Sequence, residues 1–183
     1  MMMRKVTHLH SGLRLFTHAG NCQHFSNTDV ALLYLNLRLE LDPLPLRQRW
    51  LQLTDSYHLR RTLTRLQRLH SGIAGSLLRF TGLAEQSGHR WPSLPSVLMW
   101  SPPLLAHRYR ILKQQPLSMP PPNSHAFRLA LWRLEQDVAS WHRRSVAYCE
   151  SASVSALLAD MAAARQLSLD SVFPVSDQDF GND

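Results

Sequence analysis

An apolar repeat in the C-terminal half of the chain constrains the fold more than any other feature. Its members recur at alternating intervals of four and three residues: Phe127, Leu131, Leu134, Val138, Trp141, Ser145 and Tyr148. Because an α-helix has about 3.6 residues per turn, this spacing puts them on one stripe of a helix, with Ser124 placed to cap its start. A stripe of this kind packs against other helices, and the fold class we expect is mainly α.

This apolar seam can be covered in two ways. A second helix near residues 154–167 carries Leu157, Leu158, Met161 and Leu167 and would pair with the first as a C-terminal antiparallel helical pair. Alternatively, the seam would bind a protein partner or a second copy of the chain, through Phe127, Leu131, Leu134, Val138, Trp141 and Tyr148. Three heptads are short for an independent coiled coil, which favours the packing within one chain.

The chain has 183 residues, of which 44% are hydrophobic, enough for one domain with a core and tails. The sequence divides into an N-terminal arm, a basic helical domain, a Pro-rich linker, the helical pair and an acidic tail: residues 1–26, 27–113, 114–124, 125–168 and 169–183. The structure of the arm is left open, with a short strand as one option. Its histidines are irregularly spaced, so we expect no metal ligands, and no cofactor is expected anywhere.

Residues 27–41 contain leucines at every second position from Leu33 to Leu41. This alternation is typical of a strand, whereas the cap sequence Asn27-Thr28-Asp29 favours a helix, which is the interpretation we adopt. Pro43 and Pro45 are expected to end it. Residues 46–69 are predicted to be helical, with an interruption at Thr54-Asp55-Ser56.

The net charge of +7 is unevenly distributed. Residues 43–134 carry a net charge of +11, and residues 135–183 carry −5. Arginine supplies 18 of the 20 basic residues, and its planar guanidinium suits phosphate groups and base edges. A basic centre followed by an acidic end is typical of a surface that binds a polyanion.

Within this basic centre, residues 57–69 separate leucines from arginines on a helical wheel. The apolar positions are Leu59, Leu63, Leu66 and Leu69, and the opposite side carries Arg60, Arg61, Arg65 and Arg68. No acidic residue lies between Asp55 and Glu85 to pair with these arginines along the helix. An external anion therefore explains the row of cations better than a solvated face does.

His70-Ser71-Gly72 is predicted to break this helix, because glycine readily adopts the left-handed conformation that ends one. A second short helix would follow at residues 73–83, with Ser76 and Arg79 facing outward. Two helices joined by a short turn that contains glycine form the outline of a helix-turn-helix, whose second helix enters the major groove of DNA.

A family resemblance appears across residues 58–105. "TRLQRLHSGIAGSLLRF" is similar to a helix pair of the type "ARLQxLExxTGLSRxxLxRLYRE", and "SGHRWPSLPSVLMW" to the Pro-rich step that follows it. This order of features resembles the flagellar master-regulator subunit FlhC and its relatives encoded on conjugative plasmids and integrative elements. The resemblance implies a DNA-binding transcriptional regulator with these matching positions: Arg65, Arg68, Ser76, Arg79, His89 and Arg90. The C-terminal cysteine cluster that binds zinc in FlhC has no counterpart here, so the resemblance does not extend to a zinc site.

Other functional classes have weaker support. Arg65 and His70 match the R-x4-H spacing of the HEPN ribonuclease family, but on an unbroken helix they would point roughly 140° apart. The chain has no phosphate-binding glycine loop and no paired carboxylates in its basic centre, so an enzyme is not expected. Cys22 and Cys149 are too few for a disulfide framework, and no segment is long and apolar enough to cross a membrane, so a cytoplasmic location is expected.

We therefore predict a DNA-binding transcriptional regulator, carried by a mobile genetic element, with a helix-turn-helix-like centre. The residues predicted to contact duplex DNA are Arg60, Arg61, Arg65, Arg68, Ser76, Arg79, His89, Arg90, Arg108 and Arg110. The alternative is a helical adaptor or structural subunit of a secretion or conjugation machine, which would bind its partner through the seam of residues 127–148. A HEPN-like ribonuclease is the third candidate.

Overall fold

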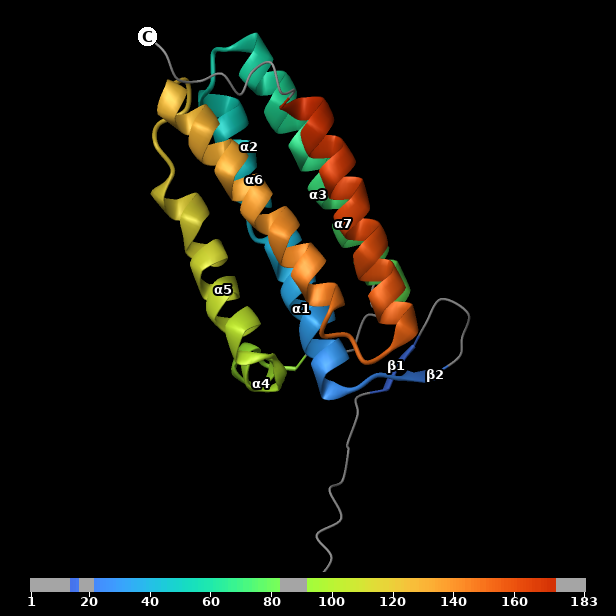
Figure 1. Ribbon diagram of the computed structural model, residues 1–183. Helices are drawn as coiled ribbons and strands as arrows, with labels where there is room; N and C mark the ends of the chain where they lie inside the picture. The colour runs from blue at the N-terminus through green and yellow to red at the C-terminus, as the bar shows by residue number, and fades with distance from the viewer. Residues whose placement is uncertain (1–13, 17–21, 83–91, 174–183) are drawn as a thin grey trace, which may run out of the picture.

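A computed structural model describes residues 14–16, 22–82 and 92–173, which form a bundle of α-helices with a small hairpin at one end (Figure 1). Its helices are α1 Asn27–Leu41, α2 Leu44–Leu53, α3 Tyr57–Thr81, α4 Leu94–Trp100, α5 Pro103–Gln114, a 3-10 turn Gln115–Ser118, α6 His125–Val146 and α7 Ala152–Val172. The expected mainly α fold is confirmed. None of the helices within these residues is long and apolar enough to span a membrane.

Two short strands lie in the N-terminal arm. β1 (Arg14–Phe16) and β2 (Cys22–His24) pair antiparallel, with Leu15 opposite Gln23. The chain then enters the bundle at Phe25, whose ring is buried and stacks on Phe80 of α3 with centroids 5.8 Å apart. The hairpin therefore leads directly into the core.

Helix α1 is the central element of the bundle. It packs against α3, α4, α5 and α6, and side chains on nearly all of its sides are buried. A helix covered on all sides needs apolar residues at consecutive positions, which explains the leucine alternation that also suggested a strand. The helical interpretation is confirmed, and Ser26 caps the helix by accepting a hydrogen bond from the Asp29 backbone N–H.

The junction between α2 and α3 lies where the sequence predicts an interruption. Thr54 ends α2, and Ser56 caps α3 by accepting a hydrogen bond from the Leu59 N–H. Asn123, which has a left-handed φ of 75°, accepts hydrogen bonds from Thr54 Oγ1 and the Asp55 N–H at 2.5 and 3.2 Å. The segment predicted as a linker is thus bonded to this junction, and it also buries Pro116.

Helix α3 is continuous from Tyr57 to Thr81, so the helix-turn-helix predicted for this region is wrong. Residues 70–72 lie within the helix, and the left-handed glycine that ends it is Gly82, with a φ of 68°. The apolar face continues in register through the predicted turn, from Leu66 to Ile73 and Leu77. Burial of these side chains outweighs the cost of a glycine inside a helix, about 1 kcal/mol.

Helices α6 and α7 run antiparallel and make the most extensive helix-helix contact of the bundle, so the predicted C-terminal pair is confirmed (Figure 1). The seam is an intramolecular core: Phe127, Leu131, Leu134, Val138 and Trp141 are each at most 4% exposed. The assignment of these residues to a protein partner is therefore wrong, because α7 and other helices of the same chain already cover them. Only Tyr148, at 38% exposure, remains at the surface.

The core consists of two apolar clusters that share α3 and α6. The larger contains much of α1 together with Ile73 and Leu77 of α3, while the smaller surrounds Trp50 of α2 and Phe127 of α6. On α3, the fully buried His70 lies between Leu66 of the smaller cluster and Ile73 of the larger one, and on α6 the fully buried Glu135 follows Leu134 of the larger cluster. Charged and titratable side chains are therefore buried beside both apolar clusters.

Candidate nucleic-acid interface and buried charge cluster

Four arginines form a row on the exposed face of α3. Arg61, Arg65, Arg68 and Arg79 are all exposed, and at 100° per residue they lie within an arc of about 60°. The buried residues of α3 lie on the opposite side. With a rise of about 1.5 Å per residue, the row extends about 27 Å along the helix. We call these four side chains the arginine row.

No residue of the arginine row forms an ion pair with any other residue in 14–16, 22–82 or 92–173. The helix itself contains no acidic residue. Arg38 of α1 shows the usual alternative, since it pairs with Asp42 one turn away at 2.6 Å. The row therefore concentrates positive charge that this part of the chain does not neutralise.

Of the remaining residues predicted to bind DNA, only Ser76 contacts this row among the described residues. Arg60 donates a hydrogen bond of 2.8 Å to the Thr54 carbonyl and thereby supports the α2–α3 junction. Ser76 donates to the Gly72 carbonyl and accepts from Arg79, so it positions that arginine. Arg108 and Arg110 lie on α5, at the opposite side of the bundle from α3 (Figure 1). His89 and Arg90 lie outside the described residues.

Arg65 and His70 do not form a common site. Arg65 is exposed, whereas His70 is fully buried and points into the bundle. The residues that would act together in a HEPN-like ribonuclease therefore lie on different sides of one continuous helix.

Sequence analysis missed a second arrangement, a cluster of charged and titratable side chains in the centre of the bundle. It is contributed by α1, α2, α3, α6 and α7, and every member is 0% exposed: Glu40, Arg47, His70, Glu135, His142 and Arg165. We call these residues the charge cluster. Each charge in it has an opposite charge nearby, as buried ionised groups require.

Arg165 lies at the centre of the charge cluster. Its Nη2 donates to both Glu40 carboxylate oxygens at 2.5 and 2.6 Å, and its Nη1 donates to Glu135 Oε2 at 2.6 Å. His70 lies between the same carboxylates, with Nδ1 2.6 Å from Glu40 and Nε2 3.2 Å from Glu135. Arg47 donates to Glu135 as well, from Nη2. Each of these contacts joins side chains from two different helices.

The surroundings keep both carboxyl groups ionised. Burial by itself raises the pKa of Glu40, but Arg165, His70 and a hydrogen bond from His142 outweigh it and hold that pKa well below 4.5. For Glu135, burial likewise raises the pKa, while Arg47, His70 and Arg165 lower it far more. Burial is the main reason that the pKa of His142 lies below 6.5, so His142 is neutral at pH 7.

The charge cluster is not arranged as a metal centre. No group of histidine, cysteine and acidic residues in the described ranges is placed to hold a metal ion. Cys149 is a free thiol whose pKa is raised to about 12 by burial and the nearby Asp29, which makes it a poor nucleophile. What the cluster can do chemically is hold five helices in one register.

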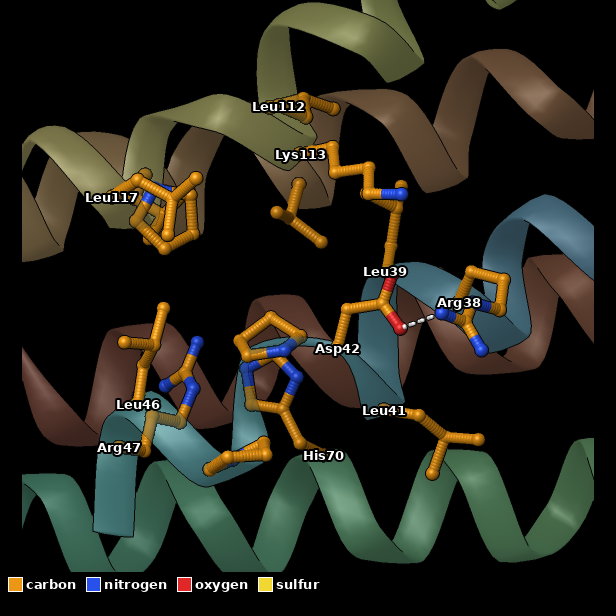
Figure 2. Close-up of a pocket in the computed structure, with 15 residues that line it drawn as sticks. Arg38, Leu39, Leu41, Asp42, Leu46, Arg47, His70, Leu112, Lys113 and Leu117 are labelled. Carbon is orange, nitrogen blue, oxygen red and sulfur yellow. Dashed lines mark ion pairs between the residues drawn. The ribbon is translucent and has the colours of Figure 1, made fainter. Parts of the chain in front are cut away.

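A cavity of about 470 Å³ lies beside the charge cluster, between the α1–α2 turn and the end of α5 (Figure 2). Arg47 and His70 reach it from the cluster, and Arg38, Asp42 and Lys113 provide its other polar side chains. Most of the remaining lining is leucine and proline, including Leu46, Leu112 and Leu117. This volume lies within the range of small-molecule sites, about 300–1,000 Å³.

No protein-family model, curated protein or solved structure matches the chain. Function therefore has to be argued from the arginine row, the charge cluster and the cavity themselves.

Proposed function

We propose that the protein binds duplex DNA through the arginine row of α3 and acts as a transcriptional regulator. The observation that carries this proposal is the placement of four exposed arginines on one face of a helix, without an ion-pair partner among the described residues. Arginine favours phosphate oxygens, and neutralising several phosphates supplies most of the affinity in non-specific DNA binding.

The mechanism is phosphate anchoring by a single long helix. Arg61, Arg65 and Arg68 cover the first half of the row, and Arg79 follows after an interval that contains Gly72 and Gly75. Without side chains at these two positions, the helix backbone can approach the duplex closely. Ser76 holds Arg79 at 3.2 Å, which fixes the orientation of one guanidinium before binding.

The regulatory part of the proposal rests on the resemblance to FlhC and its relatives on mobile elements, in which DNA binding serves transcription. With α3 unbroken, base reading by a helix-turn-helix is not part of the mechanism. A helical adaptor that uses the 127–148 seam is not supported, because that seam is the core of this chain.

The test measures the binding constant for a duplex of about 25 base pairs by fluorescence anisotropy at several salt concentrations, because phosphate contacts make this binding depend on salt. The variant is the triple substitution Arg61→Gln, Arg65→Gln and Arg68→Gln. The matched control, Arg108→Gln, Arg110→Gln and Arg133→Gln, removes the same charge from α5 and α6. Each lost phosphate contact reduces the magnitude of the slope of log K against log salt by about 0.9. The slope of the α3 variant should therefore be smaller in magnitude than that of the wild type by about 2 to 3.

The control variant should keep the wild-type slope, because its arginines lie away from the contact face. Equal slope losses in the two variants would show that only net charge matters and would remove α3 as the interface. Absence of wild-type binding at low salt would overturn the proposal. Fragments of the protein's own upstream region, compared with random duplex, test the regulatory part.

A further inference from the structure

The cavity beside the charge cluster contains a buried cation whose hydrogen-bonding capacity is only partly used. The side chain of Arg47 is 1% exposed, and its Nη2 donates to Glu135. Its Nε and Nη1 have no hydrogen-bond partner among the residues that the structure describes. Because unpaired buried donors are costly, such a guanidinium needs a further acceptor, and the cavity is the space where one can bind.

The orientation of Arg47 fits this role. In Figure 2 its side chain rises from α2 toward Leu117 across the cavity, next to Leu46. Glu135 already balances one positive charge but is shared with Arg165 and His70, and Arg47 contacts one carboxylate whereas Arg165 and His70 each contact two. An anion beside Arg47 would complete its coordination without displacing an existing bond.

The rest of the lining indicates what would be attached to that anion. Lys113 and the Arg38–Asp42 pair lie on the side of the cavity away from Arg47 (Figure 2), so the polar lining is cationic overall. Between these polar ends lie leucine and proline side chains, among them Leu112 and Leu134. Leu117 is 74% exposed and Lys113 is also exposed, so a small molecule can enter from solvent past these residues.

We propose that this cavity binds a small carboxylic acid with an apolar body, whose carboxylate accepts hydrogen bonds from Arg47 and whose body packs against Leu46, Leu112 and Leu117. This inference is independent of DNA binding, because the cavity and the arginine row use different residues. The ligand class follows from the combination of an incompletely paired buried guanidinium and an apolar wall in one cavity.

Isothermal titration calorimetry on the full chain tests the proposal with octanoate, 1-octanol and octylamine, which share a chain length and differ in charge. A hydrogen bond between charged groups should make octanoate bind at least about tenfold more tightly than 1-octanol, and octylamine should bind more weakly than either. Nuclear Overhauser contacts from bound octanoate to the methyl groups of Leu46, Leu112 and Leu117 would place it in the cavity. Equal affinity for octanoate and 1-octanol, or no saturable binding of octanoate, would overturn the proposal.

Two variants locate the site. Arg47→Met should reduce octanoate affinity to that of 1-octanol, and Leu117→Trp should obstruct the entrance and lower octanoate affinity by more than about tenfold while leaving the charge cluster intact. The matched control is Leu167→Trp, on an exposed leucine of α7 outside the cavity, which should bind octanoate as the wild type does. If Arg47→Met does not fold, the Leu117→Trp comparison still decides, and unchanged binding in that variant would contradict the assigned site.

Discussion

Arg165 is the residue on which the charge cluster depends most directly. One guanidinium binds a carboxylate of α1 and a carboxylate of α6, and it is fully buried with both of them. Glu40 and Arg165 are separated by 125 positions in the sequence, so their contact exists only in the folded chain.

Replacing Arg165 with methionine is expected to destabilise the protein by about 3–5 kcal/mol, because it leaves two buried carboxylates without their shared cation. Urea denaturation followed by circular dichroism measures the free energy of unfolding. The control is Arg143→Met on α6. The guanidinium of Arg143 is exposed and donates a hydrogen bond to Gln166, so its loss should change the free energy of unfolding by less than about 1 kcal/mol. Similar losses in the two variants would mean that the cluster contributes no more than a surface contact.

At the scale of single elements, α3 shows where local signals fail. Gly72 suggested a turn, yet its neighbours continue the apolar face of the helix, and an added Cβ at this position meets nothing within 4 Å. Gly82 instead adopts the left-handed conformation that ends the helix. The periodicity of buried residues was the stronger signal, because it reflects the burial of several side chains rather than the preference of one residue.

These two glycines give opposite predictions for the same substitution. Gly72→Ala should raise the free energy of unfolding by about 0.5–1 kcal/mol, because alanine has the higher helix propensity. Gly82→Ala should lower it by about 1 kcal/mol, because a left-handed φ strains any residue with a Cβ. Thermal unfolding of both variants measures the difference. Destabilisation by Gly72→Ala would show that the helix is broken there after all.

At the scale of the whole molecule, the charge cluster makes global stability depend on pH. The folded-state pKa of His142 lies below its ordinary value of 6.5, and those of Glu40 and Glu135 lie below 4.5. For each of these groups, there is a pH range in which the side chain is protonated in the unfolded chain but not in the folded chain. Stability is therefore full above pH 6.5 and is lost as the pH falls, first through His142 and then through the two carboxylates.

We expect the free energy of unfolding to be constant between pH 7 and 8 and to begin falling below about pH 6.5, with a slope of up to about 1.4 kcal/mol per pH unit for each group involved. His142→Gln should remove the loss between about pH 6.5 and 5 while retaining a side-chain donor for Glu40. The steeper loss below pH 4.5 should remain in that variant, since Glu40 and Glu135 are unchanged. Denaturant titrations at half-unit pH intervals measure these slopes, and a flat profile down to pH 4 would contradict the assignment.

Some residues of the candidate sites could be predicted from the sequence, and others were found only in the structure. Arg61, Arg65, Arg68 and Arg79 could be selected from the sequence, because their periodicity and the lack of acidic neighbours are local properties of one segment. The separation of Arg108 and Arg110 from them could not be predicted, because it depends on how α5 packs against α1 and α6. The charge cluster had only a weak signal, a glutamate within the leucine-rich α1 and another on the seam helix.

The sequence by itself determined the helices at residues 27–41 and in the C-terminal pair, the caps at Ser56 and Ser124, and the apolar faces that had to be buried. These follow from interactions between residues a few positions apart, which the order of residues specifies directly. Only the tertiary structure decided that the seam of α6 is covered by the chain itself and that six charged or titratable side chains are buried together beside the two apolar clusters. Those outcomes depend on contacts between distant segments, where desolvation and pairing of charges are settled only when all five helices are in place.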